Sequence, residues 1–445
     1  MIKNYFKLAL KVLARKKFFT FISLFGISFT LMILMVLTSF LENELGKHAP
    51  LSDKDKMLFL EYVSTKLMVL DTVFTIDSTL INGQIQYDTT TTFEEDQRSM
   101  SRSSYSFNLL DKHLRTVQGV DKYTFYSAGF TYNIFKNNKK LILDGIYTDA
   151  AYWKVFDFKF LHGIPYTEQE VVNQAQQAVI TEKAALSYFG EVSNVLNKEI
   201  IIEKKHYTVI GIVATVPTSQ NAVTADVFLP YTNMPNYFFG GPQDLLGPFN
   251  AVLVAKDVAG RKIIRDDLER IGNQYIMPAP KNYNKLEIDN LTFKESYAAA
   301  IIDQETPQIS LRYAKWILLS LLSLFILLPT LNLININISR ILERAAEIGV
   351  RKSFGATDRQ ILLQFVFENV ILTIIGGIIG LVLAFLAIYL INESEVLTNT
   401  QLHFNARIFF YSLLICLGFG ILSGLIPAYR ISKIPIVDSL KQNAM

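Results

Sequence analysis

Cysteine is almost absent from this sequence, since Cys416 is the only one among 445 residues. A single cysteine cannot close an intramolecular disulfide and cannot by itself build a cysteine-based metal site. The five histidines are scattered, and no two have the spacing of a metal-ligand pair. The composition therefore excludes a disulfide-stapled scaffold and offers no histidine or cysteine set that predicts a metal centre.

Motifs of nucleotide binding and hydrolysis are missing as well. The sequence contains no G-x-x-x-x-G-K-[ST], no H-E-x-x-H, no G-x-S-x-G and no C-x-x-C. The net charge of +3 is too small to indicate a nucleic-acid-binding protein. We therefore expect a non-catalytic chain that binds no cofactor and no nucleic acid.

Charge is absent from four long windows. No Asp, Glu, Lys or Arg occurs in Phe18–Leu41, Trp316–Ser339, Asn369–Asn392 or Ile408–Tyr429. About 20 apolar residues cross the hydrocarbon core of a bilayer, and one charge at mid-helix costs about 2.5–3.5 kcal/mol on insertion scales. The windows predict a membrane protein with four transmembrane α-helices and surrounding membrane lipids.

The basic residues that remain are distributed unevenly around these windows. Six precede the first window and three follow the last. Residues 340–360, called the elbow below, join the second and third windows and carry five more basic residues. The loop between the third and fourth windows carries Glu393 and Glu395 and no basic residue before Arg407. By the positive-inside rule, both termini and the elbow are cytoplasmic, and the long segment after the first helix lies outside.

These observations predict the order of the chain. We expect an amphipathic helix on the cytoplasmic face (1–17), helices at 18–41, 314–339, 361–392 and 408–429, an external α+β domain (42–313), the elbow, a short external loop (393–407) and a cytoplasmic tail (430–445). A subdomain at about 140–235 is expected to be inserted in the external domain. Gln84–Ser106 has no apolar periodicity and predicts a mobile loop whose removal leaves the fold intact. In the same domain, the sequence predicts a helix over Glu182–Phe189 that stops at Gly190, and a last strand at Leu286–Phe293.

Two local patterns concern the helices themselves. Gly355 suits a left-handed helix end, and Thr357 with Gln360 predicts a capping box that begins the next helix. Small residues recur at four-residue spacing, which allows close helix contact: Gly376, Gly380 and Ala384 in the third helix, and Gly420 and Gly424 in the fourth. The spacing leaves open whether that contact is within one chain or between two.

The elbow also resembles a known signature. Residues 347–356, EIGVRKSFGA, together with Arg344, are similar to the "R..EIG.RKA.GA" signature of the MacB/FtsX-type ABC transporter permeases, with Ser353 in place of the usual alanine. Residues 426–441, IPAYRISKIPIVDSLK, resemble the C-terminal motif of that family, in which Pro427 and Arg430 match. Fragments between 179 and 230 are similar to the periplasmic core of MacB-like members. The resemblance covers most of the chain.

The resemblance implies an FtsX-like permease with a MacB-like periplasmic core and no fused ATPase, located in the inner membrane. Two permeases, as a homodimer or with a related chain, would bind two copies of a separate ABC ATPase that holds ATP and Mg. The residues that the resemblance assigns to ATPase coupling are Arg344, Glu347, Ile348, Gly349, Arg351, Lys352 and Gly355. ATP binding would move the elbows together, and the helices would carry that motion to the periplasmic domain.

Three functions follow from the family, and the sequence leaves them open. The size of the external domain favours export of an amphiphilic substrate (a drug, peptide or lipid-like molecule), with a periplasmic adaptor and an outer-membrane channel as further partners. The first alternative is lipoprotein release, as in the LolC/LolE-like branch. The second is a non-transporting, FtsX-like regulator of a cell-wall hydrolase or signalling partner.

Overall fold

The computed structural model describes residues 15, 17–81, 84–136, 139–216, 222–235, 245–302, 307–342, 350–351, 353–394 and 402–432, of which 77–81, 84–88, 139, 326, 328–342, 358, 419–420 and 422–432 are described by their backbone alone. The chain divides into two compact units. Residues up to 46 and from 312 onward form the helical unit, and Lys47–Leu311 form the sheet unit.

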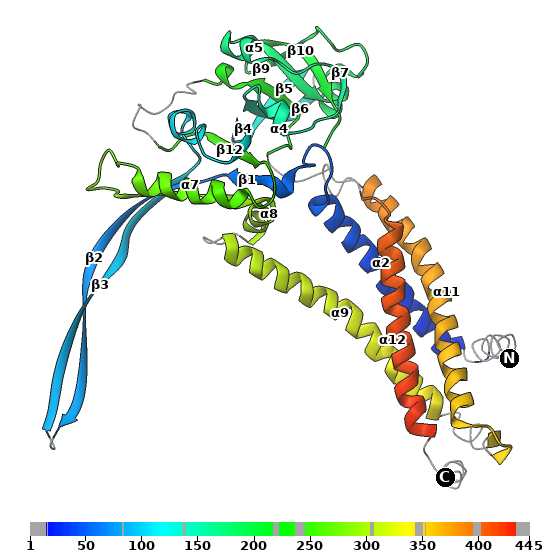
Figure 1. The fold of residues 1–445 in the computed structure, drawn as a ribbon. Helices are drawn as coiled ribbons and strands as arrows, with labels where there is room; N and C mark the ends of the chain where they lie inside the picture. The colour runs from blue at the N-terminus through cyan, green and yellow to red at the C-terminus, as the bar shows by residue number, and fades with distance from the viewer. Residues whose placement is uncertain are drawn as a thin grey trace. The chain divides into compact units, whose positions relative to one another are not determined.

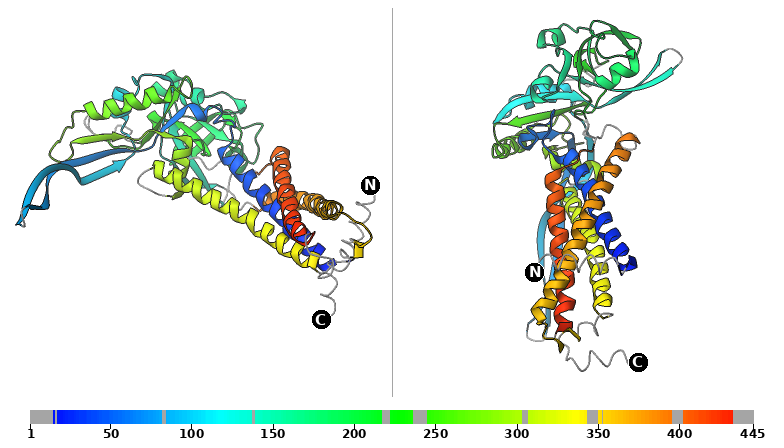
Figure 2. Two further views of the ribbon diagram at one scale, coloured as in Figure 1. Left: turned by 60° about the horizontal axis from the view of Figure 1, so that its bottom comes forward. Right: turned by 90° about the vertical axis from the view of Figure 1, so that its right-hand side faces the viewer.

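Long helices make up the described part of the helical unit. They are α2 (Lys17–Leu45), α9 (Pro307–Leu342, which begins within the sheet unit), α11 (Asp358–Glu393) and α12 (Ala406–Ser432). Figure 2 shows α2, α11 and α12 side by side. Among the described residues, Lys17–Leu45 and Arg359–Glu393 are long and apolar enough to cross a membrane, and Ala406–Gly418 is a shorter apolar stretch. The prediction of four spans therefore still depends on the sequence for α9 and α12.

The sheet unit contains a large mixed sheet and a small one. Its strands are β1 (Met57–Leu60), β2 (Val63–Ile81), β3 (Gln84–Ser103), β4 (Val120–Ser127), β5 (Phe130–Lys136), β6 (Lys139–Thr148), β7 (Phe160–Gly163), β8 (Gln177–Thr181), β9 (Glu199–Ile202), β10 (Lys205–Val213), β11 (Val227–Pro230), β12 (Phe249–Ala255), β13 (Lys285–Ile288) and β14 (Leu291–Thr292). The large sheet has the order β14-β1-β12-β4-β6-β11-β8-β10-β7, with β5 beside β6 and β9 beside β10, and the small sheet has the order β13-β2-β3.

Short helices connect these strands. They are η1 (Lys54–Lys56), α3 (Phe107–Leu109), η2 (Leu110–Leu114), α4 (Tyr152–Val155), α5 (Glu168–Val172), α6 (Glu182–Phe189), η3 (Tyr231–Asn233), α7 (Arg261–Gln274) and α8 (Phe293–Ile302). Helix α6 illustrates how the sequence sets its own ends. The Thr181 side chain caps its first turn, and Gly190 adopts a left-handed φ of 81° after its last residue. The predicted stop at Gly190 is confirmed.

The large sheet joins two hydrophobic cores. One core lies among residues 58–288 and includes Tyr105, Phe125 and Phe249, whereas the other lies among residues 132–229. The second core falls near the predicted inserted subdomain, yet its strands continue the same sheet. The two parts meet where β4 pairs with β6, at Tyr126 opposite Thr148. The region is therefore a second core built on a shared sheet.

Two sequence predictions for the sheet unit are wrong. Gln84–Ser106 is not a loop, because β3 pairs with β2 along almost their whole length, from Val63 opposite Ser103 to Ile81 opposite Gln84. Leu286–Phe293 is not a single strand, because β13 pairs with β2 while β14 pairs with β1. Strands β13 and β14 pair with β2 and β1, which lie far away in the sequence, so local periodicity does not reveal the division of Leu286–Phe293. Strand β3 pairs with its neighbour β2, but its Thr- and Ser-rich sequence has no apolar periodicity to indicate a strand.

The base of the β2–β3 hairpin belongs to the first core. Tyr105 is fully buried, and its hydroxyl donates to the carbonyl oxygen of Tyr62 at 2.6 Å. The Ser106 side chain accepts a hydrogen bond from the amide of Leu109 and so caps α3. The sequence prediction that Gln84–Ser106 can be deleted without loss of the fold is therefore wrong, because the deletion would remove core residues.

We expect a shorter deletion to be tolerated instead. Removing residues 70–95 and joining Val69 to Asp96, which are paired across the hairpin, through an Asn-Gly turn should leave the melting temperature of the sheet unit almost unchanged. Deleting 84–106 should lower it strongly, since losing a buried aromatic alone costs about 3–5 kcal/mol. Tryptophan fluorescence during heating of the full chain in detergent measures both. Equal melting of the two variants would contradict this assignment.

A buried carboxyl lies where β6 enters α4. Asp149 is 5 % exposed, its Oδ1 accepts from the Thr124 hydroxyl at 2.5 Å, and the same oxygen accepts from the Tyr152 amide at 2.9 Å. Burial raises the pKa of Asp149 to about 7, and these hydrogen bonds oppose the shift. The folded protein therefore holds the proton more tightly than the unfolded chain.

The resulting pH dependence has a defined sign. A carboxyl whose pKa is raised on folding contributes stability that is complete below its unfolded pKa of about 4 and is lost as the pH rises through about 7. We expect the sheet unit to melt several degrees lower at pH 8 than at pH 5. Asp149→Asn, which keeps both hydrogen bonds, should reduce that difference. An unchanged difference in this variant would contradict the assignment.

Candidate coupling site

The described part of the elbow is a helix end followed by a capped helix start. The Phe354 amide donates to the Val350 carbonyl at 3.2 Å, and the Ala356 amide donates to the Arg351 carbonyl at 3.0 Å. Gly355 has φ of 90°, a left-handed conformation that favours glycine. Thr357 and Gln360 form the capping box that begins α11. Both turn predictions for this segment are confirmed.

Three polar side chains connect the elbow to the interior of the helical unit. The Arg351 Nη1 donates to Gln364 Oε1 at 2.6 Å, and the Gln364 Nε2 donates to Glu368 Oε1 at 3.0 Å. Gln364 is 7 % exposed and Glu368 only 1 %. Because a carboxyl is costly to bury without hydrogen-bonding partners, these bonds help to hold it in place. We call Arg351, Gln364 and Glu368 the relay.

The sequence prediction included Arg351 but missed its two partners. Glu368 lies immediately before the charge-free window that begins at Asn369, so it was counted with neither the window nor the elbow. Gln364 and Glu368 are four residues apart in the sequence, and α11 places them on the same face. That spacing, directly after a capping box, is the sequence signal that could have identified them.

The same turn exposes apolar side chains. Phe354 is 89 % exposed and Val350 is 47 % exposed. Of the predicted coupling residues, Arg351 and Gly355 lie at this turn, while Arg344, Glu347, Ile348, Gly349 and Lys352 lie outside the described residues. A large exposed aromatic at a rigid turn is a surface that a partner can cover.

The predicted small-residue positions of α11 lie against α2 of the same chain. A Cβ at Gly380 would lie 3.0 Å from the Leu31 Cβ and 3.0 Å from the Ser28 carbonyl oxygen, and one at Gly376 would lie 2.8 Å from the Ile27 side chain. Ala384 is fully buried. Glycine is thus required at Gly380 for the helix backbones to approach this closely.

The corresponding residues of α12 are described only in part. Gly420, Gly424, Pro427 and Arg430 belong to this helix, but their side-chain surroundings lie outside the described residues. Their assigned roles in helix packing and in the C-terminal motif remain predictions.

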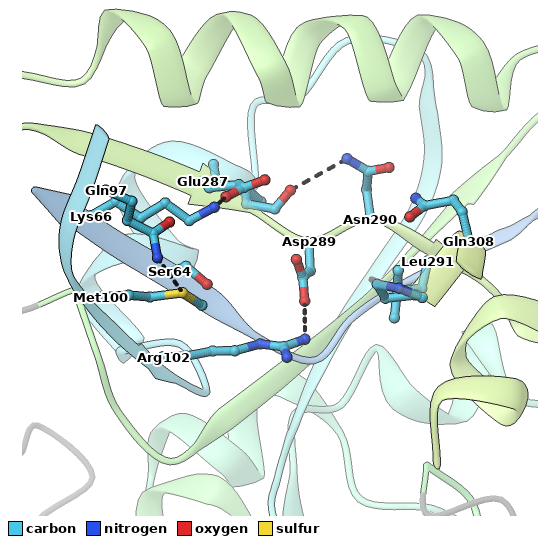
Figure 3. A pocket seen from close by; sticks show the side chains of 12 residues that line it. Ser64, Lys66, Gln97, Met100, Arg102, Glu287, Asp289, Asn290, Leu291 and Gln308 are labelled. Carbon is cyan, nitrogen blue, oxygen red and sulfur yellow. Dashed lines mark hydrogen bonds and ion pairs between the residues drawn. The ribbon is translucent and has the colours of Figure 1, made fainter. Parts of the chain in front are cut away.

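A polar pocket of about 250 Å³ opens in the sheet unit at the base of the β2–β3 hairpin (Figure 3). Its charged groups pair with one another, because Lys66 pairs with Glu287, and Arg102 pairs with Asp289 at 2.9 Å. Burial raises the pKa of Asp289, and Arg102 opposes that shift. These two ion pairs connect both strands of the hairpin to β13 and the residue that follows it. Among the described residues, no group of three His, Cys, Asp or Glu side chains could hold a metal.

Comparison with known families agrees with this architecture. A model of the MacB-like periplasmic core domain matches residues 20–271, and a model of the FtsX-like permease C-terminal region matches residues 319–436. The class is thus a membrane permease with a large extracytoplasmic domain. The chain belongs to the MacB/FtsX-type permease family.

Individual relatives are more distant. The chain is 28 % identical over 294 residues to the pyoverdine export ATP-binding/permease protein PvdT of Pseudomonas fluorescens (strain Pf0-1), covering 66 % of this chain and 42 % of that protein. It is 26 % identical over 291 residues to the macrolide export ATP-binding/permease protein MacB 1 of Yersinia pestis bv. Antiqua (strain Antiqua), covering 65 % and 42 %. The chain therefore spans less than half the length of these relatives.

One solved structure shows a weaker likeness. The periplasmic region of MacB from Actinobacillus actinomycetemcomitans aligns with 40 % of this chain and 75 % of that chain, with 20 % identity and a TM-score of 0.30.

We expect the α2–α11 contact to tolerate no larger side chain at Gly380. Gly380→Leu should overpack the contact, at about 1–3 kcal/mol or more, and lower the yield and melting temperature of the chain in detergent. Gly418→Leu is the matched control, because nothing lies within 4 Å of a Cβ at Gly418. Size-exclusion profiles after heating compare the two. Loss of the folded peak in Gly418→Leu alone would contradict the contact.

Proposed function

We propose that this chain is the permease subunit of an ABC transporter. In this proposal it couples ATP hydrolysis in a separate ATPase chain to a conformational change of the sheet unit. The observation that carries the proposal is the relay, which joins the exposed turn of the elbow to a buried carboxyl of α11. A partner that binds Phe354 can therefore act on α11 through hydrogen bonds as well as through the backbone.

These 445 residues contain no P-loop, so ATP hydrolysis would take place outside them, and we propose a separate ATPase chain. The relatives named above are ATP-binding/permease proteins, and this chain covers 42 % of each. Because those relatives combine ATP binding with a permease, they support an ATP-binding partner for this permease. ATP and Mg would be bound by that partner. The predicted coupling residues would then form the docking surface, with charge-assisted contacts from Arg351.

The proposed placement in the membrane is based on the sequence. We propose four spans, cytoplasmic termini and a periplasmic sheet unit, in the inner membrane, with a second permease copy or a related permease as partner. The absence of charge from the four windows and the excess of basic residues at the termini and elbow support this arrangement.

The proposed activity is export of an amphiphilic substrate, with a periplasmic adaptor and an outer-membrane channel. The names of the two relatives, which describe export of pyoverdine and of macrolides, favour it. The identity of the protein that binds the sheet unit would distinguish export from the two alternative functions. A lipoprotein carrier would indicate the LolC/LolE-like function, and a cell-wall hydrolase or signalling protein would indicate the FtsX-like one.

Co-purification tests the coupling proposal. The tagged chain, extracted in mild detergent, should bring with it a P-loop ATPase that mass spectrometry identifies. Phe354→Ser should reduce the recovered ATPase at least tenfold, because it removes the exposed apolar contact of the elbow. Phe135→Ser, which changes another exposed aromatic, 76 % exposed on β5, is the control and should leave recovery unchanged.

A relay variant separates docking from coupling in the same preparation. Gln364→Leu keeps Phe354 exposed but removes the bonds between Arg351 and Glu368, so the ATPase should still co-purify while transport-linked ATP hydrolysis falls. Leu363→Ala, a neighbouring change at a side chain that is 41 % exposed, should behave as the unaltered chain. If no ATPase is recovered with the unaltered chain, the proposal fails, and the chain is better described as a membrane receptor or scaffold.

A further inference from the structure

The β2–β3 hairpin extends well beyond the sheet that supports it. Strand β13 pairs with β2 only from Val63 to Lys66, whereas the pairing of β2 with β3 continues to Ile81 (Figure 1). We call residues 67–99, beyond the support of β13, the arm. A two-stranded hairpin without a third strand or a packed face is marginally stable in water. A surface that covers the arm would stabilise it.

One face of the arm carries four large apolar side chains. Leu70, Phe74 and Ile76 alternate along β2, and Phe93 of β3 lies opposite Thr72 on the same face. Glu95, opposite Leu70, lies at the edge of this apolar group. The four apolar side chains are 64 % to 69 % exposed. Large apolar side chains gathered on one exposed face are typical of an interaction site.

The other face is acidic. Asp71 lies directly opposite Glu94, and Asp96 lies opposite Val69. Two like charges opposite each other destabilise a hairpin, and Arg98, at the root of the arm, pairs with Asp71 and, at 3.1 Å, with Asp96. From Val69 to Gln97 the sequence contains six acidic residues (Asp71, Asp77, Asp88, Glu94, Glu95 and Asp96) and no basic residue, for a net charge of −6.

The base of the arm is held firmly. Asn284 brackets Met68, since its Oδ1 accepts from the Met68 amide at 2.8 Å and its Nδ2 donates to the Met68 carbonyl at 2.6 Å. Arg102 pairs with Asp289 and lies 4.3 Å from the ring centroid of Tyr62. The arm is thus presented from a fixed root.

We propose that the arm is the docking surface for a separate extracytoplasmic protein, whose contact surface is apolar and bordered by lysine or arginine. The apolar face supplies burial, and the charge of −6 over residues 69–97 selects and steers a basic partner. The same charge disfavours two other occupants. Two arms from two copies of this chain would repel each other, and an anionic lipid surface would repel the arm. The inference does not depend on the proposed ATPase coupling.

Site-specific photo-crosslinking in cells tests the proposal with the full chain. A benzophenone amino acid at position 93 reports on the apolar face, and the same group at Thr92 reports on the acidic face. We expect a product with a protein other than this chain, at least tenfold stronger from position 93, and a contact peptide with net positive charge. Replacing Glu94, Glu95 and Asp96 by lysine, which brings the net charge of residues 69–97 from −6 to 0, should reduce that product at least tenfold.

The matched control makes the same change of charge elsewhere. Replacing Glu168, Glu199 and Glu203, all exposed in the sheet unit, by lysine should leave the product unchanged, and tryptophan fluorescence on heating shows that each variant is folded. A product with a second copy of this chain, a product with lipid only, equal products from positions 92 and 93, or no product would overturn the proposal. Because Cys416 is the only cysteine, Phe93→Cys with Cys416→Ala tests the second copy directly, and we expect no disulfide dimer on oxidation.

Discussion

A buried carboxyl within an apolar helix must be satisfied by hydrogen bonds, and Glu368 of α11 meets this requirement through the relay. Gln364 has both a donor and an acceptor in its amide, so it can accept from Arg351 and donate to Glu368 at the same time. The position of the elbow turn is thereby linked to the side-chain packing of α11. The capping box at Thr357 and the left-handed Gly355 set the direction in which the chain enters that helix.

The close contact between α2 and α11 extends this link from the elbow to a second helix. A glycine at 380 lets the backbone of α11 approach Ser28 and Leu31 of α2 closely, and closely packed interiors transmit displacement instead of absorbing it. A push on the elbow would therefore reach α2, the helix that precedes the sheet unit in the chain. In the proposed function, this contact would carry motion of the elbow toward the sheet unit.

The sheet unit has one continuous large sheet and two hydrophobic cores. Its large sheet passes from one core to the other at the pairing of β4 with β6. The two parts therefore share backbone hydrogen bonds, and Tyr231 and Met234 pack against both cores. The arm lies outside both cores. It therefore carries little of the stability of the unit, and its sequence is free to serve recognition.

The sequence alone determined the membrane class, the family, and the positions of several helix ends and turns. Charge-free windows, the elbow signature, Gly190, Gly355 and the Thr357–Gln360 box depend on properties of neighbouring residues, and these can be recognised without a fold. The arm could also have been anticipated, because Asn82-Gly83 directly after the alternating segment Thr72–Ile81 is a hairpin signal. The Thr- and Ser-rich composition of Gln84–Ser106 concealed it.

Only the tertiary structure decided which distant residues meet. It placed Tyr105 in a core, divided Leu286–Phe293 between two sheets, set Gly380 against α2 of the same chain, and joined Arg351 to Glu368 through Gln364. The reason is that strand pairing, helix contact and side-chain hydrogen bonding join residues far apart in the chain. Many pairs of strands, helices and side chains in one sequence could form such contacts, and the sequence alone does not show which pairs do.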